Sequence, residues 1–267
     1  MLQLRFNSSF GCWFRLMFIV GILVPSAGAA ADKLVGLYSA HAVPYAMPWV
    51  AEEMEMFKKY DLDFEFVYIP SSSTATAALL GGNVEVGLLG GIGVVNAFVN
   101  GATDLVLIGS IKNFMTQSIL AKPEITKLQE LKGKKIGVTR LGSSSDFAIR
   151  EYLQKNKLQP NRDVSIVHVG GMAELAAALN NGSISAAPLS SPSSHIAEQK
   201  GNRVIANLAN EGIYFVIAGL TTTRRFLREQ RSDAKTFLRA FGRATHFMFQ
   251  QKDEAKKILT KYAKIDD

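Results

Sequence analysis

Residues 63–71 (DFEFVYIPS) and residues 163–171 (DVSIVHVGG) share an order of polar, β-branched and aromatic side chains at an offset of 100 positions. At the same offset, residues 77–84 (AALLGGNV) match residues 177–184 (AALNNGSI), and Leu89 matches Leu189. A constant offset over several segments favours an internal duplication over chance similarity between two strand–helix units.

Each copy predicts the order strand, helix, strand, helix, strand. Short β-branched and aromatic runs predict buried strands at 64–69 and 164–169, and Ala/Leu-rich segments predict helices at about 73–80 and 172–180. We expect Gly82 and Gly182 to end these helices in the left-handed conformation, ahead of strands at 84–89 and 184–189. Strands at 34–38 and 135–139, with helices at about 46–59 and 145–155, complete the two copies.

Alternating strands and helices imply an α/β fold, and two copies imply a two-lobed one, each lobe a parallel-rich sheet flanked by helices. Residues 114–121 predict a connection leaving lobe one, and residues 213–220 predict a strand returning to it. Two crossings form a hinge beside a cleft, and we expect it near 115–118 and 218–221. Lobe one then comprises 32–116 and 219–267, with helices at about 224–229, 232–250 and 252–262, and lobe two comprises 117–218.

Residues 1–31 have the features of a cleaved secretory signal peptide. Arg5 and Arg15 precede an apolar run at 16–24, and small residues at 26–31 follow Pro25. The run is shorter than the ~20 residues that span a bilayer, although an uncleaved anchor helix is the alternative interpretation. The single cysteine, Cys12, lies in this segment, so the mature chain would have no thiol for a disulfide, a metal or catalysis. We therefore expect export to a bacterial periplasm.

The charge distribution argues against nucleic acid as a partner. The chain has 30 Lys and Arg against 23 Asp and Glu, a formal net charge of +7, and its densest basic group is Arg224, Arg225, Arg228 and Arg231. No basic run is interleaved with aromatic residues as a nucleic-acid groove requires. A solvated helix face is the favoured interpretation, with mild attraction for anionic solutes or an acidic partner.

Sequence signatures of enzymes and metal sites fail on spacing. Residues 142–146 (GSSSD) resemble a nucleophile elbow but end in Asp146 where that motif has glycine. The four histidines have no metal-ligand spacing, and residues 90–93 (GGIG) lack the full dinucleotide-binding pattern. We expect no catalytic residue, no metal site and no cofactor.

Candidate binding residues follow the predicted strands, because ligands of open parallel sheets bind beyond the carboxyl ends of the strands. Hydroxyls, glycines and predicted helix N-termini gather there and offer backbone N–H donors to an anionic or polar head group. Ordinary helix capping is the alternative for each loop alone. The candidate ligand-binding residues are Ser39, His41, Ser72, Ser73, Thr74, Gly91, Ser143, Ser144, Ser145, Gly171, Met172 and Ser191.

Several stretches resemble the SsuA-like solute-binding proteins of the nitrate/sulfonate/taurine group of ABC importers. They are residues 49–62, 68–74 (YIPSSST), 131–138 (LKGKKIGV), 142–147 (GSSSDF) and 219–224 (GLTTTR). The resemblance runs from about residue 33 onward and implies a type II periplasmic-binding fold, a small-molecule ligand between the lobes and a permease partner in the inner membrane. The family is defined by fold more than by one ligand, so the substrate does not carry over.

The sequence thus predicts a monomeric periplasmic binding protein of an ABC importer, without catalytic activity, for a small anionic or polar organic solute. An enzyme related to thiamine-pyrimidine synthases, which share the fold, is one alternative. Those synthases use a cysteine-rich iron motif that has no counterpart in this chain. A sensory binding protein is the other alternative.

Overall fold

The computed structural model describes residues 33–263, so the predicted signal peptide lies outside the described residues. The first sheet has five strands in the order β2-β1-β3-β10-β4. β1 pairs in parallel with β2 and β3, and β10 pairs antiparallel to β3 and β4. Its strands are β1 (Leu34–Tyr38), β2 (Phe64–Tyr68), β3 (Val86–Leu89), β4 (Leu105–Phe114) and β10 (Tyr214–Thr223).

The second sheet repeats this arrangement in the order β7-β6-β8-β5-β9, with β5 antiparallel to β8 and β9. Its strands are β5 (Ser118–Ala121), β6 (Lys135–Val138), β7 (Ser165–His168), β8 (Ala186–Leu189) and β9 (Arg203–Asn207). β6 pairs in parallel with β7 and β8. The parallel-rich, two-sheet α/β fold predicted from the sequence is confirmed.

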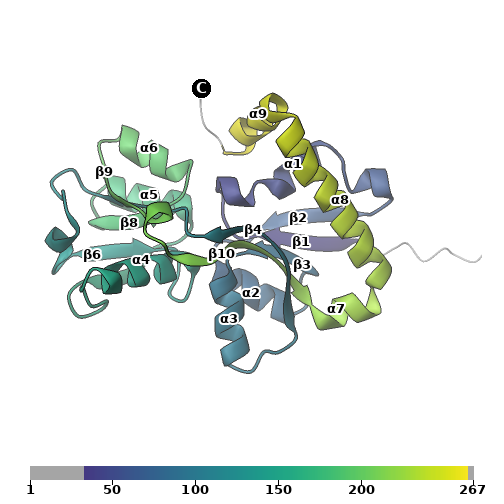
Figure 1. Ribbon diagram of the computed structural model, residues 1–267, viewed down its shortest axis with the longest axis horizontal. Helices are drawn as coiled ribbons and strands as arrows, with labels where there is room; N and C mark the ends of the chain where they lie inside the picture. Colours follow the sequence, from purple (N-terminus) through teal and green to yellow (C-terminus); the bar gives the residue numbers. More distant parts are fainter. Residues whose placement is uncertain (1–32, 264–267) are drawn as a thin grey trace, which may run out of the picture. The chain divides into compact units, whose positions relative to one another are not determined.

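The helices flank both sheets (Figure 1). The α-helices are α1 (Met47–Glu53), α2 (Ser72–Leu80), α3 (Gly91–Val99), α4 (Ser144–Lys155), α5 (Met172–Asn180), α6 (Ser193–Gln199), α7 (Arg224–Glu229), α8 (Arg231–Gln250) and α9 (Lys252–Ala263). The 3-10 helices are η1 (Val43–Tyr45), η2 (Lys58–Tyr60), η3 (Leu128–Leu131) and η4 (Leu208–Asn210). Within residues 33–263, no helix is both long and apolar enough to cross a membrane.

The predicted duplication is confirmed in three dimensions. Helices α2 and α5 begin and end 100 positions apart, as do strands β3 and β8. Gly82 and Gly182 follow the two helices with φ of 71° and 79°, the left-handed conformation that glycine adopts without strain. One expected helix is shorter than predicted: α1 ends at Glu53, because the chain turns through Glu55 with a φ of 49°.

The chain crosses between the two sheets twice, each time from an edge strand of one sheet into a strand of the other. Edge strand β4 leads through residues 115–117 into β5, and edge strand β9 leads through residues 208–213 into β10. The second crossing therefore precedes the expected position at 218–221, which lies inside β10. There Gly219 pairs with Leu89 and Ser110, and a Cβ on it would lie 2.7 Å from Leu107 Cδ2. Gly219 thus permits close packing within the sheet. The lobe boundaries given above stay a prediction.

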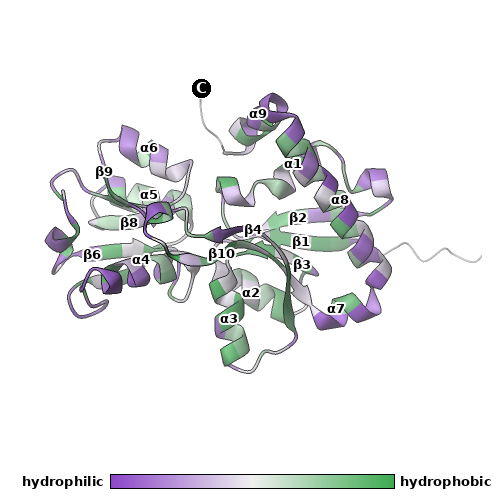
Figure 2. Ribbon diagram, viewed as in Figure 1, coloured by the Kyte–Doolittle hydropathy of each residue, from purple (hydrophilic) through white to green (hydrophobic). Residues whose placement is uncertain are grey.

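Alternate side chains of the strands bury on opposite faces of each sheet. In β1, Leu37 packs in a cluster with Leu79 of α2, whereas Leu34 belongs to a cluster with Trp49 of α1 and Phe237 of α8. Burial of each such side chain contributes about 1.5–3 kcal/mol. Figure 2 shows the resulting pattern, with hydrophobic strands in the first sheet and a mainly hydrophilic α7. These two packed layers fix the carboxyl ends of the strands, where the site is built.

Candidate ligand-binding site

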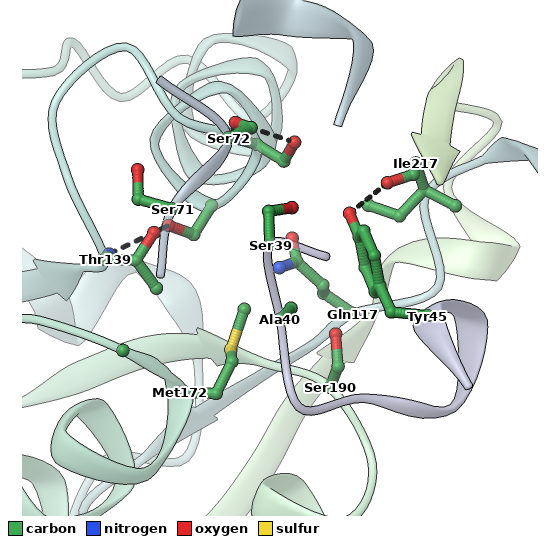
Figure 3. A pocket seen from close by; sticks show the side chains of 13 residues that line it. Ser39, Ala40, Tyr45, Ser71, Ser72, Gln117, Thr139, Met172, Ser190 and Ile217 are labelled. Carbon is green, nitrogen blue, oxygen red and sulfur yellow. Dashed lines mark hydrogen bonds between the residues drawn. The ribbon is translucent and has the colours of Figure 1, made fainter. Parts of the chain in front are cut away.

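A small polar chamber lies where the carboxyl ends of strands from both sheets meet (Figure 3). It encloses about 20 Å³, room for roughly one water molecule. Its lining comes from the loops after β1, β2, β6, β7 and β8, from the crossing at residues 115–117 and from β10. The lining residues are Ser39, Ala40, Tyr45, Ser71, Ser72, Gln117, Thr139, Ser144, Ser145, Gly171, Met172, Ser190 and Ile217.

The N-termini of α2 and α4 meet directly across the chamber. The backbone N–H of Ser144 donates to the Ser72 hydroxyl at 3.1 Å, and the two hydroxyl oxygens are 3.4 Å apart. Both serines are buried, with 4% and 8% of their surface exposed. The first turn of α4 leaves N–H groups without an intrahelical acceptor, and the Ser72 hydroxyl of α2 accepts from one of them. This hydrogen bond joins the N-termini of the two helices in the closed arrangement.

A network of buried hydroxyls supports the α4 side of the chamber. Thr139 Oγ1 lies 3.0 Å from Ser143 Oγ and 2.9 Å from Ser145 Oγ, and those two serine oxygens are 2.9 Å apart. Ser145 Oγ also accepts from the Thr139 backbone N–H at 2.9 Å. Ser143 is the N-cap of α4, accepting from the Asp146 N–H at 3.4 Å. For Ser143 the structure thus shows helix capping, the alternative to ligand binding, and Ser143 does not line the chamber.

Formal charge is kept out of the chamber. The Asp146 carboxylate accepts from the Gly142 N–H at 2.8 Å and from Arg150 Nε at 2.7 Å, so it is neutralised within its own loop and helix. Among the described residues lining the chamber, Tyr45 is the one with an ionisable side chain. Burial raises the pKa of Tyr45 far above its usual range, and its hydroxyl donates to the Ile217 carbonyl. The chamber therefore offers neutral dipoles and helix N-termini.

His41 lies outside the chamber, in an aromatic cluster. Its Nε2 is 3.2 Å from the Tyr38 hydroxyl, and its ring stacks on Trp49 and lies 3.9 Å from the Tyr68 ring, centroid to centroid. Desolvation, followed by the nearby Glu174 charge, raises the pKa of Tyr68 to about 12. His41 lines a neighbouring hollow of about 430 Å³ between this cluster and helices α5 and α6.

The predicted binding residues divide into two groups. Those that line the chamber are Ser39, Ser72, Ser144, Ser145, Gly171 and Met172. Those that do not are His41, Ser73, Thr74, Gly91, Ser143 and Ser191. Gly91 starts α3 against β10, since a Cβ there would lie 3.0 Å from Val216 Cβ. The Ser191 carbonyl accepts from the Val43 N–H at 3.2 Å. Contact of any of these residues with a ligand stays a prediction.

Sequence reasoning missed the rest of the lining. Thr139 and Ser190 directly follow strands, and Ser71 lies three residues after β2, so the rule that selected their neighbours would have found them. Gln117 reaches the chamber from the crossing between β4 and β5, and Ile217 reaches it from β10; no local motif marks either residue. Within residues 33–263, no group of three or more His, Cys, Asp or Glu side chains is placed to hold a metal ion.

Comparison with known proteins agrees with this architecture. The family model described as NMT1/THI5 like matches residues 44–255. The solved alkanesulfonate-binding protein SsuA from Xanthomonas axonopodis pv. citri, bound to MOPS, is 21% identical, with a TM-score of 0.76 over 88% of this chain and 80% of that one. The periplasmic nitrate-binding protein NrtA from Synechocystis PCC 6803 is 15% identical, with a TM-score of 0.73 over 88% of this chain and 68% of that one.

A curated relative, YtlA of Bacillus subtilis (strain 168), is 23% identical over 217 residues, which is 78% of this chain and 64% of YtlA. The chain thus spans less than two thirds of the length of that relative. The solved structures confirm the predicted periplasmic-binding fold. Since the family match covers most of the sequence, the chain belongs to the NMT1/THI5-like family.

Proposed function

We propose that this chain is the solute-binding component of an ABC importer, exported to the periplasm, and that it holds a small polar or anionic organic solute in the chamber. The observation that carries the proposal is the meeting of Ser72 and Ser144, two helix N-termini from different sheets, at the chamber wall. Helix N-termini bind anions through free N–H groups and the helix dipole. SsuA and NrtA are named as binding proteins for an alkanesulfonate and for nitrate, both oxyanions.

Release and capture follow from the size of the chamber. A volume of about 20 Å³ has room for roughly one water molecule and is therefore too small for an organic solute. The sheets must therefore separate about the two crossings to admit a solute and close on it afterwards. A permease in the inner membrane would distinguish the occupied form from the empty one by this difference in geometry.

Binding is favoured over catalysis by the chemistry of the lining. Nucleophilic serines need an adjacent general base. Among the described residues, the chamber lining includes no His, Asp, Glu or Lys side chain. The chamber serines instead contact Thr139, Ser143 and each other.

Native mass spectrometry of the protein, mixed with a small-molecule extract of its host, tests the proposed function. We expect a non-covalent adduct whose small molecule is recovered chemically unchanged. Ser144→Trp, which fills the chamber, should abolish the adduct, and Ser232→Trp, at an exposed position of α8, should leave it intact. Absence of an adduct with the wild-type chain, or recovery of an altered molecule, would contradict the proposal.

A further inference from the structure

One polar atom at the chamber is left unexplained by the proposed function. Gln117 is 1% exposed and lines the chamber from the crossing between β4 and β5. Its side-chain oxygen Oε1 is buried and has no hydrogen-bond partner among the described residues. An unpaired buried amide oxygen costs on the order of 1–3 kcal/mol. An unpaired buried acceptor in the wall of a binding chamber indicates that its hydrogen-bond donor belongs to the bound solute.

The surroundings of Gln117 hold it in place without satisfying this oxygen. Its backbone carbonyl accepts from the Leu208 N–H at 2.9 Å, which ties one crossing to the other. The Tyr45 hydroxyl, which also lines the chamber (Figure 3), donates to the Ile217 carbonyl instead. The backbone contact thus holds Gln117 in place at the chamber wall. Its side-chain oxygen Oε1 remains an acceptor without a donor within residues 33–263.

Helix N-termini elsewhere in the chamber wall present hydrogen-bond donors, whereas Gln117 Oε1 is an acceptor. Helices α2, α4 and α5 begin there, at Ser72, Ser144 and Met172, and present the positive ends of their dipoles. This part of the wall suits a solute oxyanion, which accepts hydrogen bonds. Gln117 Oε1 suits an N–H or O–H group, which donates one. The two requirements together describe a solute with both functions.

We propose that Gln117 is a specificity-determining residue that accepts a hydrogen bond from an N–H or O–H group of the bound solute. The solute class is then an amino- or hydroxy-substituted organic acid whose oxyanion lies at the helix N-termini. Anions that carry acceptors alone, such as unsubstituted alkanesulfonates, leave the Gln117 oxygen buried and unpaired. The inference rests on the proposed function, because it places the solute in the same chamber.

Matched probes test this inference in the wild-type chain. The pairs are 2-hydroxyethanesulfonate and 2-aminoethanesulfonate, each against ethanesulfonate, and 3-hydroxypropanoate against propanoate, with Kd measured by isothermal titration calorimetry. We expect at least one donor-bearing probe to bind about tenfold more tightly than its unsubstituted partner, as one buried hydrogen bond allows. Equal affinity within every pair, or failure of every donor-bearing probe to bind, would overturn the proposal.

Variants assign the preference to Gln117. Gln117→Leu removes the acceptor and should abolish the preference within a pair. The matched control is Gln154→Leu, at an exposed position of α4. Persistence of the preference in Gln117→Leu would overturn the assignment. Should Gln117→Leu fail to fold, Gln117→Met tests the same point.

The two proposals fail in distinguishable ways. If the host-extract adduct forms but no probe pair shows a preference, the role of Gln117 is overturned and the binding function stands. If neither the extract nor any probe binds, the binding function is overturned together with the inference drawn from it.

Discussion

A side-chain carbon on Gly90 would lie 1.7 Å from the hydroxyl oxygen of Ser144. Gly90 follows β3 of the first sheet, and Ser144 begins α4 beside the second. The backbone of Gly90, with φ −72° and ψ 131°, is one that any residue adopts. The glycine is therefore required by the close approach of α4 and not by its own conformation.

Gly90→Ala should keep α4 away from Ser72 and weaken solute binding at least tenfold. The added methyl group occupies the position of the Ser144 hydroxyl, so the closed arrangement becomes strained while each sheet keeps its own packing. Titration with the host-extract solute measures the affinity. In small-angle scattering, the radius of gyration of the occupied Gly90→Ala protein should exceed that of the occupied wild-type protein.

The control for Gly90→Ala is Gly242→Ala in α8, where an added Cβ meets no heavy atom within 4 Å. That change should leave binding unaltered and raise stability by about 0.5–1 kcal/mol, because alanine is the better helix former. Unchanged affinity in Gly90→Ala would show that closure of the Ser144 contact plays no part in binding.

Ser72→Ala should weaken solute binding about 5- to 30-fold. It removes the acceptor of the Ser144 N–H, and a buried donor left unpaired costs about 1–2 kcal/mol in the closed arrangement. Ser73→Ala is the matched control, because Ser73 is the next residue of α2, its Oγ contacts Ser71 Oγ, and it does not line the chamber. Equal losses in the two variants, measured by calorimetry, would contradict a specific role for Ser72.

Acid should loosen the attachment of α9 to α1. The amino group of Lys261 donates to the Glu53 carboxylate at 2.7 Å and lowers the pKa of Glu53, with a further contribution from the Tyr262 hydroxyl. A lowered folded-state pKa means that this contribution is present above the unfolded pKa near 4.5 and is lost as pH falls through the folded value.

Hydrogen exchange of α9 between pH 7 and pH 3 measures this effect. Protection should fall toward the acid end in the wild-type chain, and Glu53→Gln should already show the reduced protection at pH 7. A Glu53→Gln variant with wild-type protection of α9 across the whole range would rule out the ion pair as the cause.

The duplication explains which parts of the fold the sequence predicts well. Strand β2, helix α2 and strand β3 each have a counterpart 100 positions later, so each copy supports the assignment of the other. Helix α3 and strand β4 follow the duplicated segment and were not predicted. The expected second crossing at 218–221 lies inside β10, because an apolar run containing glycine looks the same in sequence in a crossing and in a strand packed on both sides.

The candidate site is predictable to the extent that strand ends determine it. Ser39, Ser72 and Ser144 follow strands or begin helices, so sequence order alone indicates that each lies at the carboxyl ends of the strands of its own sheet. Gln117 has no such signal, because its place in the chamber depends on which strand the crossing joins. Ser143 and Ser145 show the converse problem: neighbouring serines of one loop look alike in sequence, yet Ser143 caps α4 and Ser145 reaches the wall.

Cysteines at positions 72 and 144 should lock the chamber shut. The two hydroxyl oxygens are 3.4 Å apart, so thiols in their place need only a small shift to form a disulfide of about 2.05 Å. The sole native cysteine, Cys12, lies in the predicted signal peptide, so the mature double variant would carry no competing thiol. A chamber of about 20 Å³ cannot admit an organic solute without separation of the two serines. We therefore expect the oxidised Ser72→Cys/Ser144→Cys protein to form no adduct with the host extract and the reduced protein to regain it.

The single variants Ser72→Cys and Ser144→Cys should respond to neither oxidant nor reductant. An oxidised double variant that binds as well as the reduced one would place the solute outside this chamber.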